Sequence, residues 1–196
     1  MYGRRSDTVL LKNSYANKPP ATVLLTLSAM ATALTALALY VAGNLGFIKL
    51  TAYFCSAIFV FALTTEGAFG HAILVYIASS AIGFLIITSK INLLPYLALL
   101  GHYCIFKDYL DLKLKNRGVG FMLKMLYCNV FTAIGVLILQ FVLNVDILTL
   151  FPDIPLGLIA LALEIGFVTL ELLSNLARNI YTSRIRNAIV RINRGA

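Results

Sequence analysis

The chain has 196 residues, of which 60% are hydrophobic and only 12% are charged. Its mean hydropathy is +0.89, whereas about a quarter of the residues in soluble domains are charged. This composition excludes an ordinary soluble domain and indicates an integral membrane protein. The net charge of +8 would by itself be compatible with nucleic-acid binding. Cations beside membrane spans, however, orient a protein and bind anionic lipid headgroups, so we expect no nucleic-acid partner.

Six apolar segments are each about long enough to cross a hydrocarbon core of ~30 Å as a helix. They cover residues 21–43, 46–64, 68–88, 93–110, 119–143 and 156–178. We therefore predict an all-helical integral membrane protein with six transmembrane helices. Residues 1–20 form an N-terminal arm, residues 21–178 a single membrane domain, and residues 179–196 a basic tail.

Lys and Arg residues are distributed unevenly between the two sides of this bundle. When the connections alternate between the sides, one side has only Lys49 and Lys90. The other side has the remaining fourteen of the sixteen: Arg4, Arg5, Lys12, Lys18, Lys107, Lys113, Lys115, Arg117, Lys124, Arg178, Arg184, Arg186, Arg191 and Arg194. Because cytoplasmic loops retain Lys and Arg, we expect both termini to be cytoplasmic.

The first span is rich in small residues. Ala29 and Ala33 are four positions apart, as are Ala38 and Ala42. Such spacing places a smooth stripe on one helix face, which lets another helix approach closely. The stripe predicts either internal packing against a neighbouring span or a docking face for a separate membrane subunit, and the pattern leaves both open.

The fourth to sixth spans carry charged residues near their cytoplasmic ends. Such groups are costly at membrane depth unless they are paired or hydrated. Lys107, Lys124 and Glu171 come from one span each, and we predict a structural layer in which Glu171 pairs with Lys107 or Lys124. Lys107 with Asp111, and Asp111 with Lys115, also have the i to i+4 spacing of local ion pairs.

A second polar layer lies near the predicted midplane and consists of His102, Asn129 and Glu164. We take these three as candidate substrate-binding residues. A carboxyl group at this depth is either a neutral acid hydrogen-bonded to Asn129 or His102, or part of a hydrated cavity for a solute or proton. The sequence leaves both interpretations open.

The tail has Ile185, Ile189 and Ile192 at helical spacing between its arginines. This pattern is typical of a basic amphipathic helix on the inner leaflet. We expect anionic lipids as its partner, with a cytoplasmic protein as the alternative.

Catalytic and cofactor motifs are missing from the sequence. It has no His-Glu-x-x-His, no intramembrane Asp pair, no Gly-x-Ser-x-Gly and no phosphate loop. The three cysteines, Cys55, Cys104 and Cys128, fall inside predicted helices without paired spacing, which predicts neither a disulfide framework nor a metal site. We therefore expect no enzyme, no cofactor and no metal.

A pattern in the fourth and fifth spans supports a family resemblance. Its positions are Pro95, Tyr96, Gly101, Tyr103, Lys107, Lys124 and Asn129. The pattern resembles small six-span membrane proteins of Gram-positive bacteria, over about residues 63–178. Those proteins are in turn similar to the substrate-binding S components of energy-coupling-factor (ECF) transporters, which have six helices, cytoplasmic termini and about this length.

The resemblance implies partners and a function. In S components the first helix carries Ala-x-x-x-Ala motifs that dock on a transmembrane coupling subunit, which two ATPases drive. The matching positions here are Ala29, Ala33, Ala38 and Ala42. The chain would then be an uptake module of a bacterial plasma membrane that binds a vitamin or other small solute. The alternatives are a non-transporting membrane scaffold or assembly protein, and a proton-linked small-solute carrier that uses Glu164.

Overall fold

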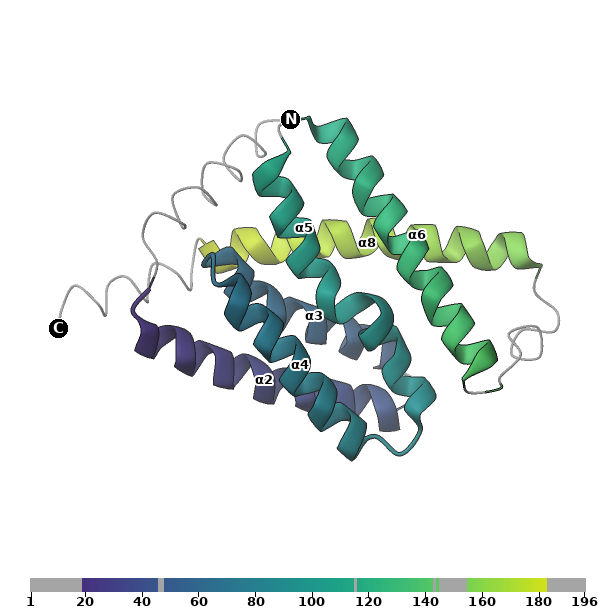
Figure 1. Ribbon diagram of the computed structural model, residues 1–196, viewed down its shortest axis with the longest axis horizontal. Helices are drawn as coiled ribbons and strands as arrows, with labels where there is room; N and C mark the ends of the chain where they lie inside the picture. Colours follow the sequence, from purple (N-terminus) through teal and green to yellow (C-terminus); the bar gives the residue numbers. More distant parts are fainter. Residues whose placement is uncertain (1–18, 46–47, 115, 143, 145–154, 183–196) are drawn as a thin grey trace.

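The computed structural model describes residues 19–45, 48–114, 116–142, 144 and 155–182. Within these ranges every regular element is helical (Figure 1). In chain order the elements are α2 (Ala21–Asn44), α3 (Lys49–Thr65), α4 (Phe69–Ile86), the 3₁₀ turn η2 (Lys90–Leu93), the π-helical turn η3 (Tyr96–Leu100), α5 (Gly101–Lys113), α6 (Arg117–Phe141) and α8 (Leu156–Ile180). The predicted all-helical fold is confirmed for this part of the chain, while the predicted amphipathic tail helix lies largely outside it.

Four of these helices, α2, α4, α6 and α8, are long and apolar enough to cross a membrane. Helix α3 is also apolar but has only 17 residues. The predicted fourth span is divided among η2, η3 and α5, with Pro95 directly before the π-helical turn. Proline donates no backbone hydrogen bond and disturbs a regular helix, which accounts for the irregular start of this segment. Six spans and the sides of the termini stay a prediction.

Helices α2, α3, α4 and α5 enclose the core. In Figure 1 helices α2, α3 and α4 lie together on one side, and α8 crosses α5 and α6 in this view. Leu39, Phe61, Tyr96 and Tyr103 are fully buried where these elements meet. By contrast, α6 and α8 leave most of their large apolar side chains exposed, as expected for helices that face lipid.

Gly101 allows a close approach between elements of this core. A Cβ atom there would lie 2.5 Å from Cδ2 of Tyr76 and 2.9 Å from Cζ of Tyr96. The Tyr76 hydroxyl donates to the Leu97 carbonyl, and the Tyr96 and Ser79 hydroxyls are bonded at 2.7 Å. The glycine therefore gives α4 and the η3–α5 segment the space to pack ring against backbone.

The turn between α3 and α4 is tight. Gly67 has a φ of 72°, a left-handed conformation that favours glycine. The Ala68 amide donates to the Leu63 carbonyl and the Gly67 amide to the Thr64 carbonyl, both at 3.0 Å. These two bonds form a Schellman motif, which satisfies the last carbonyls of α3 and reverses the chain at once.

Polar contacts close the bundle at the opposite end. Asn92 donates to the Gly43 carbonyl at 3.0 Å and accepts from Nζ of Lys49 at 3.1 Å. Lys90 donates to the Ile87 carbonyl at 2.8 Å, next to the end of α4. The two cations assigned to the outer side, Lys49 and Lys90, thus lie at the same end of the bundle, where α2 and α4 end and α3 begins.

Candidate functional site: a buried ion-pair network and an apolar groove

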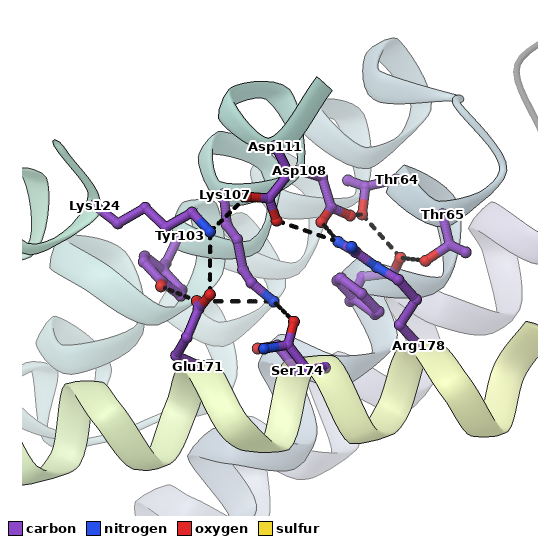
Figure 2. Close-up of polar contacts among 12 residues, drawn as sticks. Thr64, Thr65, Tyr103, Lys107, Asp108, Asp111, Lys124, Glu171, Ser174 and Arg178 are labelled. Atoms are coloured by element: carbon purple, nitrogen blue, oxygen red, sulfur yellow. Dashed lines mark hydrogen bonds and ion pairs between the residues drawn. The ribbon is translucent and has the colours of Figure 1, made fainter. Parts of the chain in front are cut away.

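Six charged side chains form a connected network between α5, α6 and α8 (Figure 2). Three are cationic and three are acidic, so their formal charges cancel. They are Lys107, Asp108, Asp111, Lys124, Glu171 and Arg178. Lys107, Asp108, Lys124 and Arg178 are buried. Unpaired charges that are buried in this way would each cost several kcal/mol, and a neutral cluster avoids that cost.

Glu171 is the centre of one half of the network. Its Oε1 atom lies 3.0 Å from Nζ of Lys124, and its Oε2 atom lies 3.8 Å from Nζ of Lys107. The Tyr103 hydroxyl donates to Oε2 at 2.7 Å, and Lys107 also donates to Oδ1 of Asn175 at 2.8 Å. The prediction that Glu171 pairs with Lys107 or Lys124 is confirmed, and both lysines take part.

Asp108 is the centre of the other half. It is fully buried and forms an ion pair with Arg178 of α8, and the Thr64 hydroxyl donates to its Oδ2 atom at 2.5 Å. Asp111 joins the two halves, because its Oδ1 atom lies 2.6 Å from Nζ of Lys124 and its Oδ2 atom 3.8 Å from Arg178. Helix α8 is thereby tied to α3, α5 and α6 through a single polar cluster.

One aromatic ring adds to this arrangement. The centroid of the Phe61 ring is 5.5 Å from Nζ of Lys107 and 5.2 Å from Cζ of Arg178. Both distances are within the range of cation–π attraction. Glu171, Asn175 and Arg178 are spaced by four and three positions and so share one face of α8. That face, with Leu170 and Ser174, is the buried side of the helix.

The local Lys107–Asp111 ion pair predicted within α5 does not form in the structure, and the Asp111–Lys115 pair stays a prediction. Lys107 makes its ion pair with Glu171, and Asp111 makes its pairs with Lys124 and Arg178. Both α5 residues thus pair with residues of other helices, because the buried charges of α6 and α8 also need partners of opposite charge. Lys115 lies outside the described residues. The Asp108–Arg178 pair was not predicted from the sequence. A signal for it was present, because Arg178 is seven residues from Glu171 and therefore lies on the same helix face.

Asn129 and Glu164 meet between α6 and α8. Nδ2 of Asn129 donates to Oε1 of Glu164 at 3.0 Å. A hydrogen bond to Asn129 is part of one of the two interpretations of Glu164, and both interpretations stay predictions. Glu164 also lines an open groove with a volume of about 340 Å³. The other lining residues are Phe121, Met125, Leu161, Ile165, Phe167, Val168 and Thr169. Glu164 is thus set in mostly apolar surroundings.

His102 has other partners. Its Nδ1 atom is 2.8 Å from the Tyr127 hydroxyl. The Tyr76, Tyr127 and Phe131 rings pack around it, with centroid distances of 5.6, 5.6 and 4.5 Å. It makes no hydrogen bond or ion pair with Asn129 or Glu164, all three being described residues. The structure therefore brings together two of the three candidate substrate-binding residues and places the third in an aromatic cage.

The alanine stripe of α2 is divided between two environments. Ala38 and Ala42 are buried, at 9% and 0% exposure, and Ala42 belongs to the core cluster. Ala29 and Ala33 are exposed. The internal-packing interpretation thus applies to Ala38 and Ala42, which a partner could not reach in this structure. Only Ala29 and Ala33 have the position that docking requires.

Cys55, Cys104 and Cys128 are free thiols. Among the residues that the structure describes, no three His, Cys, Asp or Glu side chains lie where they could hold a metal ion.

A scan of family models, a search of curated proteins and a search of solved structures each found no match to this chain.

Proposed function

We propose that this chain is a membrane-embedded solute-binding subunit of the S-component type. In this proposal the groove between α6 and α8 holds the solute, and separate subunits provide energy for uptake. The observation that carries the proposal is Glu164, which lines a groove of about 340 Å³ and accepts a hydrogen bond from Asn129. A few polar groups in a mostly apolar cavity of roughly 300–1,000 Å³ are typical of small-molecule sites.

The proposed topology has six membrane crossings with both termini in the cytoplasm of a bacterial cell. Besides the four long helices, α3 and the η2–α5 segment would cross. Lys90–Leu93 and Gly101–Lys113 bound a segment of about the length that a crossing needs. The ion-pair network then lies toward the cytoplasmic side and Lys49 and Lys90 toward the outside, in agreement with the uneven distribution of cations.

The exposed part of the α2 stripe supports the proposed partner. Ala29 and Ala33 are one helical turn apart and both are exposed, so the backbone of another membrane helix could approach α2 there. We propose that this surface contacts a transmembrane coupling subunit that is driven by two ATPases. Anionic lipids would bind the basic tail.

The test is affinity purification from native membranes in mild detergent, with mass spectrometry of the proteins that co-purify. We expect a transmembrane subunit and two ATPases with the unmodified chain, and their loss with Ala33→Leu. Ala81→Leu is the matched control, because Ala81 is an exposed alanine of α4, and it should retain the partners. Recovery of the chain without such subunits would contradict the proposal.

A second candidate, a non-transporting membrane scaffold, is favoured by the ion-pair network itself. The charges of the network balance among α5, α6 and α8, so no charge remains there for a solute. In that case the same purification would recover other membrane proteins and no small molecule.

A further inference from the structure

The groove between α6 and α8 offers an unusual combination of surfaces to a ligand. Leu161, Ile165 and Val168 of α8 face Phe121 and Met125 of α6 across it. A ligand that covers these apolar atoms binds more favourably because it removes apolar surface from water. The volume of about 340 Å³ is near the lower end for small-molecule sites. The body of the ligand should therefore be small and formed of hydrocarbon or aromatic groups.

The polar groups at the groove are the Glu164 carboxylate, the Asn129 amide that is bonded to it and the Thr169 hydroxyl. Nδ2 of Asn129 is bonded to Oε1 of Glu164. The Thr169 hydroxyl donates to the Ile165 carbonyl at 2.8 Å. Oε2 of Glu164 and Oδ1 of Asn129 remain as acceptors that no described residue occupies. A ligand group that meets them must donate hydrogen bonds.

Glu164 also differs in charge environment from the three acids of the ion-pair network. Asp108, Asp111 and Glu171 each have a cation within 4 Å. Glu164 has no such described cation, and the groove is lined by no Lys, Arg or His. An anionic carboxylate in apolar surroundings is stabilised strongly by an opposite charge and repels a like one.

We propose that the groove binds a small lipophilic monocation, with an apolar body and one ammonium group that donates to Oε2 of Glu164 and Oδ1 of Asn129. Leu161, Ile165 and Val168 are 61%, 59% and 44% exposed. The groove therefore opens on the flank of α6 and α8 that faces lipid in the proposed topology, and the ligand enters from the bilayer. This inference rests on the proposed solute-binding function and specifies the chemistry of the solute.

The experiment compares three probes that share one apolar body: 4-phenylbutylamine, 4-phenylbutan-1-ol and 4-phenylbutyrate. The full chain is placed in phosphatidylcholine nanodiscs, and binding of tritiated amine is measured against empty nanodiscs, with the other probes as competitors. We expect saturable binding of the amine, at least tenfold tighter than that of the alcohol, and no competition by the acid. Equal competition by the alcohol or the acid would overturn the proposal.

Two variants test the place of binding. Glu164→Gln should weaken binding of the amine at least tenfold. Leu161→Trp, at the exposed rim, should do so by filling the groove without removing the carboxylate, and it keeps the test valid if Glu164→Gln does not fold. Gln140→Ala changes an exposed polar residue of α6 outside the groove and should retain the original affinity. Unchanged affinity in folded Glu164→Gln, or in Leu161→Trp, would refute the site.

Failure of this inference is distinguishable from failure of the proposed function. If the coupling subunits co-purify but the amine has no preference over its neutral analogue, the ligand class is wrong and the uptake function stands. If the amine binds through Glu164 but no coupling subunit is found, the ligand class stands and the uptake function is wrong.

Discussion

Arg178 near the end of α8 forms an ion pair with Asp108 of α5, which lies 70 positions earlier in the chain, and both side chains are buried. The Thr64 hydroxyl also donates to Asp108, and Asp111 makes a second ion pair with Arg178. Helix α8 is otherwise largely exposed. Its position against the bundle therefore depends strongly on these buried charges.

Removal of one partner of this pair should destabilise the protein. Arg178→Met leaves the Asp108 carboxylate buried without its main cation, which typically costs about 3–5 kcal/mol. We expect a loss of this order in the free energy of unfolding, measured by denaturant titration in detergent micelles. Lys113→Met, at an exposed site on α5, is the control and should change it by less than about 0.5 kcal/mol.

The double variant Asp108→Leu, Arg178→Met separates charge from packing. Replacing both members of a buried pair with apolar residues is often neutral or stabilising, so the double variant should recover at least half of the loss caused by Arg178→Met. A loss in the double variant as large as that in Arg178→Met, or larger, would show that the pair does not act as a unit.

Gly101→Ala should destabilise the junction of α4 with the η3–α5 segment. Its Cβ would lie 2.5 Å from the Tyr76 ring, and such overpacking typically costs about 1–3 kcal/mol. Gly166→Ala is the matched control, because nothing lies within 4 Å of a Cβ at that helical position. It should stabilise α8 by up to about 1 kcal/mol through the higher helix propensity of alanine. Equal effects of the two substitutions would disagree with the packing described for Gly101.

The two halves of the α2 stripe should respond differently to enlargement. Ala42→Leu adds atoms at a fully buried position and should lower the thermal unfolding temperature of the isolated chain. Ala33→Leu adds them at an exposed position and should leave that temperature nearly unchanged, so any loss of partner proteins would not result from misfolding. Comparable destabilisation by both variants would place Ala33 inside the bundle.

The proposed topology can be checked by cysteine labelling in intact cells. In a background without Cys55, Cys104 and Cys128, Asn44→Cys should react with a membrane-impermeant maleimide added outside. Lys113→Cys, at the end of α5, should react only after the cells are opened. The reverse order would mean that both termini face outward, and reaction of both from one side would exclude the alternation of sides.

Some of these contacts could be predicted from the sequence and others could not. Hydropathy locates the helices, and the cost of buried charge predicts that Glu171 meets a lysine. The Asp108–Arg178 pair and the aromatic cage of His102 depend on how each helix is rotated about its axis, which hydropathy does not determine. Likewise, Ala29 and Ala42 belong to one small-residue pattern, and only the packing of α2 against α3 and α4 shows that one is exposed and the other buried.

The central claim is that the groove at Glu164 holds a solute while another surface binds the coupling subunits. Native mass spectrometry of the intact complex, purified from its own membrane, tests both parts in one spectrum. We predict that the unmodified chain carries a small molecule together with its partner subunits, and that Glu164→Gln loses the small molecule but retains the partners. A small molecule bound equally to both proteins, or to neither, would contradict the claim.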